Sequence, residues 1–163
     1  MKTSTLLLVL LVGFLSSSLT AQKTIWFDAN WETTTKEKAH YYRPVPEKKD
    51  NKYWVVDYYL DGTKQMEGYS SANSPEEDHL EGLVLYYYPS GKISHKIYYK
   101  DGAADGKREE YYESGELKEV GNYENGKRSG IWKTYYKNGK IQVKGKYEQG
   151  EKVGIWKSYY KNE

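Results

Sequence analysis

The stretch GIWKTYYKNGKIQVKGKYEQGEKV, residues 130–153, decides the fold of this chain, because its features recur every 24 residues. Glycines keep this spacing at Gly82, Gly106, Gly130 and Gly154. Tyrosine pairs keep it at 87–88, 111–112, 135–136 and 159–160. A strict period of this length indicates stacked copies of one supersecondary unit.

An earlier and less regular unit carries Tyr58-Tyr59 and stands 29 residues before the next tyrosine pair. The additional residues lie in SSANSPEEDH, 70–79, which predicts a loop. We therefore predict an N-terminal capping segment over 22–52 and a repeat region over 53–163. The expected units of the repeat region are 53–81, 82–105, 106–129, 130–153 and 154–163.

Each unit predicts a β-hairpin, because Asn138-Gly139 between two alternating runs is a two-residue turn signal. Residues equally distant from the turn should then pair: Tyr136 with Ile141, Thr134 with Val143, and Trp132 with Gly145. Trp132 opposite Gly145 is an aromatic residue expected to cover a weak strand position. The earlier units should pair Val55 with Gly68, Val84 with Ile97, Arg108 with Gly121, Tyr88 with Ile93, Tyr112 with Leu117, and Glu110 with Glu119. The last is a like-charge pair expected to weaken its unit.

Directly opposed residues share a face, so each hairpin has an apolar face around Trp132 and a face rich in lysine and tyrosine. No segment predicts a long amphipathic helix to cover the apolar face. We expect an all-β fold of stacked antiparallel β-hairpins forming an elongated, twisted single-layer sheet. The residues expected to maintain the repeat are Gly82, Gly106, Gly130, Gly154, Trp132, Trp156, Gly139 and Gly145.

The segment before the repeats has a different pattern. Residues 22–52 predict a short strand, a turn or single helical turn, and a second strand. Within them EKKDNK, 47–52, predicts a solvated loop.

Composition argues against several functions. The 163 residues hold 25 Lys and Arg against 23 Asp and Glu, and this balance gives no support to nucleic-acid binding. The absence of cysteine excludes a disulfide framework and a cysteine nucleophile. His40, His79 and His95 have no metal-ligand spacing, and neither Glu76-Glu77-Asp78 nor Glu109-Glu110 forms a credible acid–base pair. We expect neither an enzyme nor a cofactor.

The N-terminus predicts export. Met1-Lys2-Thr3 precedes the apolar run LLLVLLVGFL, 6–15, and SSSLTA ends at Ala21. This is the pattern of a secretory signal peptide, 1–21, and the run is shorter than the roughly 20 residues that span a bilayer. We expect cleavage before Gln22, no stable membrane span afterwards, and a periplasmic or secreted location.

The repeat resembles a known family. The pattern at Gly130, Trp132, Tyr135, Tyr136, Asn138, Gly139, Gly145, Tyr147, Gly150 and Gly154 is similar to the MORN repeat variant of bacterial proteins, many of them named antitoxins. The resemblance implies protein scaffolding and binding of acidic lipids. Lys133, Lys140, Lys144 and Lys146 could then contact lipid headgroups, or form an ordinary solvated face, since glutamates are interspersed.

A row of tyrosines is the candidate ligand site. Tyr87, Tyr111, Tyr135 and Tyr159 should form an exposed ladder that stacks on sugars, anchors a protein, or only stiffens the sheet. We predict a non-catalytic, exported protein-binding or scaffolding module of the bacterial cell envelope, with an unknown envelope protein or glycan as partner. The alternative is a carbohydrate-binding surface module. A third hypothesis, an antitoxin, requires retention in the cytoplasm.

Overall fold

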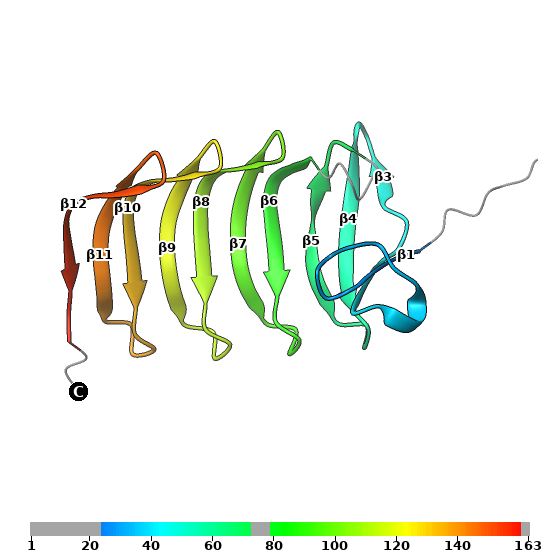
Figure 1. Ribbon diagram of the computed structural model, residues 1–163, viewed down its shortest axis with the longest axis horizontal. Coiled ribbons are helices and arrows are strands. Elements are labelled where there is room, and N and C mark those ends of the chain that lie inside the picture. The colour runs from blue at the N-terminus through cyan, green and yellow to red at the C-terminus, as the bar shows by residue number, and fades with distance from the viewer. Residues whose placement is uncertain (1–23, 73–78, 161–163) are drawn as a thin grey trace, which may run out of the picture.

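The computed structural model describes residues 24–72 and 79–160, which form one open antiparallel sheet. The predicted all-β fold of stacked hairpins is confirmed. Figure 1 shows the strands side by side along the long axis of the molecule, with the N-terminal elements at one end. The elements are β1 Ile25–Phe27, η1 Lys36–Lys38, β2 Tyr41–Arg43, β3 Glu47–Lys49, β4 Lys52–Tyr59, β5 Lys64–Ser70, β6 Leu80–Tyr87, β7 Ile93–Lys100, β8 Ala103–Tyr111, β9 Leu117–Glu124, β10 Lys127–Tyr135, β11 Ile141–Glu148 and β12 Glu151–Ser158. From β4 onward every strand pairs with its neighbour in the sequence.

Two sequence predictions fall outside the described residues. The predicted signal peptide, 1–21, is one of them, and residues 73–78 of the predicted loop are the other. Within 24–72 and 79–160, no helix has the length and apolar character needed to cross a membrane.

The N-terminal segment forms the first end of the sheet. A strand, a helical turn and a second strand follow one another as predicted, and β2 pairs with the end of β4. The buried guanidinium of Arg43 donates two hydrogen bonds to the buried carboxylate of Asp57, at 2.7 and 2.9 Å. Residues 47–52 are exposed as predicted, but the prediction of a loop is wrong, because β3 pairs with β4. Asp50 adopts a left-handed conformation, φ 56°, which permits a tight turn between these two strands.

The turn inside each hairpin differs from the predicted two-residue turn. The Tyr136 carbonyl accepts a hydrogen bond from Gly139, and the Tyr136 N–H donates to the Lys140 carbonyl, which leaves a three-residue loop. Only Gly139 has a positive φ, whereas a two-residue turn of the expected type needs one at Asn138 as well. The Asn138 side chain instead accepts a hydrogen bond from the Lys140 N–H at 3.1 Å.

Two-residue turns occur at the opposite end, between successive hairpins. Asp101-Gly102 and Asn125-Gly126 have positive φ at both residues, and their flanking residues are paired. The same two-letter signal therefore gives two kinds of turn in one chain.

The predicted register is confirmed in the body of each hairpin and wrong beside the loop. The observed pairs include Thr134–Val143, Trp132–Gly145, Arg108–Gly121, Val84–Ile97, Val55–Gly68 and Glu110–Glu119. Beside the three-residue loop the partner shifts by one, so Ile141, Ile93 and Leu117 pair with Tyr135, Tyr87 and Tyr111. They do not pair with Tyr136, Tyr88 and Tyr112 as predicted.

Between hairpins, the first strand of each unit is bent. From Ser129 to Lys133, β10 advances four residues while β9 advances two, from Asn122 to Val120. Gly130 lies within this bulge with φ 68°, and the equivalent Gly82, Gly106 and Gly154 also have positive φ. Figure 1 shows these strands turning sharply near their starts. The strict glycine period therefore marks a bend that side chains with a Cβ disfavour.

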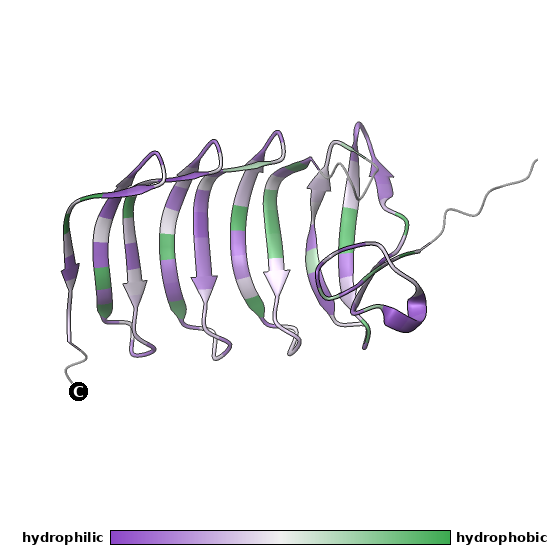
Figure 2. Cartoon of the chain, viewed as in Figure 1, coloured by the Kyte–Doolittle hydropathy of each residue, from purple (hydrophilic) through white to green (hydrophobic). Residues whose placement is uncertain are grey.

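One face of the sheet is closed by side chains of neighbouring units, and we call it the packed face. Val55, Val84, Arg108, Trp132 and Trp156 occupy equivalent positions on it. Figure 2 shows the resulting alternation of hydrophobic and hydrophilic residues along the strands. Trp132 is 2% exposed although the sheet has a single layer.

The indole of Trp132 achieves this burial by leaning onto the preceding hairpin. A Cβ built at Gly121 would overlap the indole, and Trp156 lies in the same way on Gly145. The carbonyls of Asn122 and Ser129 each accept the indole N–H at 3.2 Å. The prediction that Trp132 covers Gly145, its partner in the hairpin, is therefore wrong. The indole lies on Gly121 of β9 instead, where its N–H reaches these two carbonyls.

The other side of the Trp132 ring is also covered. The guanidinium of Arg128 lies 4.1 Å from the ring centroid, and the rings of Tyr123 and Tyr147 meet it edge-on. Lys152 lies 4.5 Å from the Trp156 centroid in the equivalent place. Trp132 and Trp156 thus each lie between a glycine and a cation, and neighbouring units cover each other without a second layer.

The hairpin β8–β9 replaces this arrangement with ion pairs. Arg108 stands in the place of Trp132 and contacts both Glu119, at 2.6 Å, and Glu110, at 2.8 Å. Lys118 adds a third contact to Glu110 at 2.5 Å. The like-charge pair predicted to weaken this unit exists, but Arg108 bridges its two carboxylates and so compensates their repulsion.

Candidate functional site

The side of the sheet opposite the packed face is the open face. Leu83, Lys107, Ile131 and Ile155 occupy equivalent positions on it. Ile131 is 46% exposed and Ile155 82% exposed, whereas Trp132, next to Ile131 in sequence, is buried. Large aliphatic side chains therefore lie exposed on the face that the sequence predicts to be polar.

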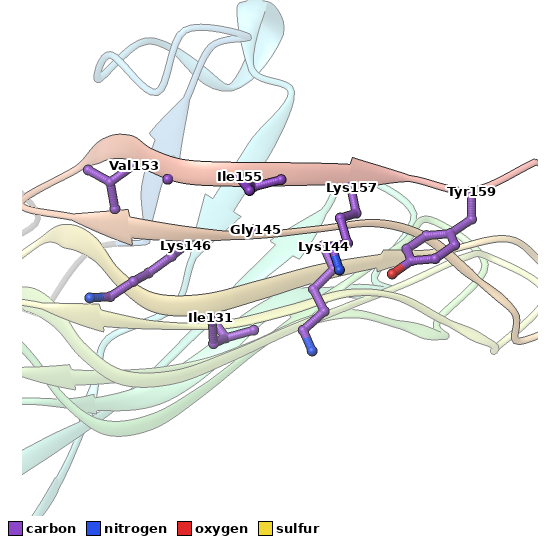
Figure 3. Close-up of a pocket in the computed structure, with 9 residues that line it drawn as sticks. Ile131, Lys144, Gly145, Lys146, Val153, Ile155, Lys157 and Tyr159 are labelled. Atoms are coloured by element: carbon purple, nitrogen blue, oxygen red, sulfur yellow. The ribbon is translucent and has the colours of Figure 1, made fainter.

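These aliphatic residues line a hollow on the last three strands. Figure 3 shows Ile131 of β10 with Val153 and Ile155 of β12, and lysine side chains around them. The hollow has a volume of about 460 Å³, and Tyr159 lies at its end. It combines an apolar floor with a cationic border.

Three lysines form a row across the same strands. Lys133 pairs directly with Lys144, and Lys144 pairs directly with Lys157. Like charges directly opposite one another destabilise a sheet. Among the described residues none of the three forms an ion pair, whereas Lys107 contacts Glu109 and Lys146 contacts Glu148, each at 2.5 Å. Positive charge is thus left unneutralised at one end of the open face.

The tyrosine ladder lies on the open face but is not uniform. The Tyr87 hydroxyl donates to the Glu67 carboxylate, and the Tyr111 hydroxyl donates to Glu109 at 3.0 Å. Burial, followed by the hydrogen bond to Glu67, raises the pKa of Tyr87 far above its ordinary value of 10.0. The hydroxyl groups of Tyr87 and Tyr111 therefore already form hydrogen bonds within the sheet.

The last residue of the ladder is the accessible one, since Tyr135 is half-buried like Tyr87 and Tyr111. Tyr159 is 44% exposed and borders the hollow. Tyr135 follows Lys133 on the open face of β10. A binding role for the four ladder residues stays a prediction, and exposure favours Tyr159 for it. Lys140, predicted to share the lysine face, belongs to the loop after β10.

The second tyrosine of the first four pairs has a role that the sequence did not predict. The hydroxyls of Tyr59, Tyr88, Tyr112 and Tyr136 each donate to the backbone carbonyl of the first tyrosine of the next pair, Tyr87, Tyr111, Tyr135 and Tyr159, at 2.7–2.9 Å. Each bond joins one unit to the next. The sequence did contain a signal for this role: both tyrosines of the pair recur in every unit, although a ladder of exposed rings would need only one tyrosine per unit.

The described residues hold no cluster of three His, Asp or Glu side chains arranged for a metal. Glu109 and Glu110 lie on opposite faces, with Glu110 beside His95 on the packed face. Burial, then the charge of Arg108, lowers the pKa of His95. The segment Glu76-Glu77-Asp78 lies outside the described residues.

Comparisons with known proteins agree with the hairpin period. The family model described as MORN repeat variant matches residues 80–101, 104–125 and 128–149, which coincide to within one residue with the hairpins β6–β7, β8–β9 and β10–β11. No match is found among curated proteins. Among solved structures, a chain in the crystal structure of accessory secretory protein 1, 2 and 3 in Streptococcus pneumoniae aligns at 14% identity with a TM-score of 0.23. The alignment covers 66% of this chain and 20% of that one, and so weak a likeness supports no argument.

Proposed function

Three stretches of the chain, 80–101, 104–125 and 128–149, match the MORN repeat variant family, and on that premise we propose that the chain is a non-catalytic module that binds protein partners. The observation that supports this most is the contrast at neighbouring positions of β10. Trp132 is used to hold the units together, while Ile131 is exposed on the open face. Exposed aliphatic residues beside polar ones are typical of protein-interaction surfaces.

The proposed location is the bacterial cell envelope. The signal-peptide pattern of residues 1–21 supports export. Cell fractionation followed by intact-mass measurement tests it. A chain starting near Gln22 in the periplasm or medium is expected. A full-length chain in the cytosol would reject export and make the antitoxin hypothesis the leading one.

A photo-crosslinking residue at position 155 tests protein binding in intact cells. It is expected to capture the same partner repeatedly in the envelope fraction. The matched control is the same crosslinker at Leu60, which is 54% exposed but lies in a loop after β4. Equal capture from both positions, or products that contain only this chain, would count against the open face as a binding surface.

Carbohydrate binding is the second candidate, supported by the exposed position of Tyr159 at the end of the hollow. Sugar rings stack on accessible aromatic faces. Replacing Tyr135 and Tyr159 together by Ala should then abolish retention on cell-wall polysaccharide. The Tyr87→Ala variant is the matched control, because that ring is tied to Glu67. Unchanged retention of the double variant rejects this candidate.

A further inference from the structure

We propose that the partner presents an acidic amphipathic helix that lies across β10, β11 and β12 on the open face. This rests on the protein-binding function proposed above and names the chemistry of the partner. The binding patch consists of the lysine row Lys133, Lys144 and Lys157 and the aliphatic group Ile131, Val153 and Ile155.

Charge is the first argument. The three lysines stand directly opposite one another, and within the described residues no carboxylate neutralises them. Other lysines of this face have such partners, as Lys107 and Lys146 show. A ligand with carboxylates would relieve the repulsion, and electrostatic complementarity of this kind selects partners.

Spacing is the second argument, and it favours a helix over an extended peptide. Adjacent strands lie about 4.8 Å apart, so the lysine row covers roughly 9.6 Å. Residues three and four apart on a helix are about 5–6 Å apart, and three such residues cover about 10.5 Å at 1.5 Å per residue. Same-side residues of an extended chain are about 6.6 Å apart, and three of them cover roughly 13 Å.

The apolar group supplies the second contact of the helix. Ile131 precedes Lys133 by two residues on β10, so the aliphatic group lies beside the lysine row, roughly 6.6 Å away. On β11 the residue in register with Ile131 and Val153 is Lys146, which contacts Glu148. A helix about 10 Å in diameter covers the aliphatic group and the lysine row at once. Its carboxylates would face the lysines, and an adjacent stripe of leucines would fill the hollow shown in Figure 3.

Binding of two synthetic helical peptides to the protein recovered from cells tests this. One peptide carries Glu at i, i+4 and i+7 beside a leucine stripe. The other has the same composition, with the glutamates on the opposite side of the helix. Fluorescence anisotropy should show at least roughly tenfold tighter binding of the first peptide, and the preference should fall as salt is raised. Equal affinities would overturn the proposal.

A charge exchange identifies the lysines. Lys144→Glu should lower the affinity for the acidic peptide roughly tenfold or more. It should raise the affinity for a peptide whose glutamates are replaced by lysines. Lys107→Glu is the matched control, since that lysine lies on the same face but is paired with Glu109. Equal effects of the two substitutions would reject a role for the lysine row.

Anionic vesicles separate a membrane from a protein partner. Phosphatidylglycerol vesicles that displace the acidic peptide from the wild-type protein and fail to bind Lys144→Glu would assign the patch to a membrane surface and overturn the helix proposal. If crosslinking at position 155 captures a protein but neither peptide binds, the acidic helix is wrong while protein binding stands. If the crosslink also fails, the proposed function itself is wrong.

Discussion

The two faces of this sheet are built from the same strands but differ in how their large side chains are placed: they are buried on one face and exposed on the other. On the packed face, large side chains lie on glycines of the neighbouring unit, so Trp132 is buried in a single layer. On the open face, Ile131 and Ile155 are exposed. The difference indicates that the repeat period serves cohesion on one face and leaves the other available for a partner.

Replacing Trp132 by Ala should have the largest effect. It removes a buried ring together with its contacts to Gly121 and Arg128, and large aromatic truncations cost about 3–5 kcal/mol. Urea unfolding measures the loss. Ile131→Ala, the neighbour on the open face, should cost less than about 1 kcal/mol. Similar losses from both would remove the distinction between the faces.

Gly121→Ala should be the next most costly change. The methyl group would overlap the Trp132 indole, and overpacking of this kind costs about 1–3 kcal/mol. In a Trp132→Ala background the same substitution should change the free energy of unfolding little, because the indole that the methyl group would overlap is absent. A double-mutant cycle by urea unfolding measures the coupling. Additive costs would show that the ring does not lie on Gly121.

The hydroxyl of Tyr112 should contribute less. Tyr112→Phe removes one hydrogen bond to the Tyr135 carbonyl, worth about 0.5–1.5 kcal/mol, and leaves the ring in place. Tyr111→Phe is the control from the same pair, since its hydroxyl bonds Glu109 within its own strand and not the next unit. Thermal unfolding should show the larger decrease for Tyr112→Phe. The reverse order would contradict the assigned role of the second tyrosine.

Acid should weaken the packed face through Glu110. Burial would raise the pKa of this carboxyl, but hydrogen bonds from Lys118 and Arg108 outweigh burial and hold the pKa below 4.5. Because the folded pKa is the lower one, the carboxylate stabilises the fold fully above pH 4.5, and this contribution is lost as the pH falls through the folded value. Glu110→Gln should flatten the dependence of unfolding free energy on pH in this range. An unchanged slope would show that Glu110 is not the group responsible.

Lys144→Gln should give the smallest effect, with the opposite sign. It removes like charges opposite Lys133 and Lys157, which should stabilise the sheet by about 0.2–1 kcal/mol. Thermal unfolding at low salt measures the gain. If the substitution stabilises the fold and also lowers the affinity for the partner, Lys144 is retained for binding and not for stability. Destabilisation would instead assign Lys144 to cohesion.

The sequence predicted the hairpins because their turn signals and register depend on residues close together in the chain. Thr134–Val143 and Trp132–Gly145 follow from that local rule. The contact of Trp132 with Gly121 does not, because it depends on the bulge at Gly130 that sets one hairpin against the next. The turn at Asn138-Gly139 was wrongly predicted as a two-residue turn. The Asn138 side chain accepts a hydrogen bond from the nearby Lys140 N–H, and this arrangement competes with the left-handed conformation that a two-residue turn requires of Asn138.

The candidate site was predicted in part for the same reason. The lysine and tyrosine residues of one hairpin, and Ile131 with them, fall on one face by the register alone, but the hollow that Ile131 forms with Val153 and Ile155 depends on the pairing of β11 with β12. Lys157 joins Lys133 and Lys144 only through the pairing of β11 with β12 between units. The pairs Tyr87–Glu67 and Tyr111–Glu109, which engage half of the ladder, likewise needed the folded sheet.

The most direct test of this account is the affinity of the Ile131→Ser, Ile155→Ser double variant for the partner captured by the crosslink at position 155. We expect at least roughly tenfold weaker binding with a stability change below about 1 kcal/mol, because both side chains lie on the open face and are already exposed. Unchanged affinity, or weaker binding accompanied by loss of stability comparable to that of Trp132→Ala, would contradict it.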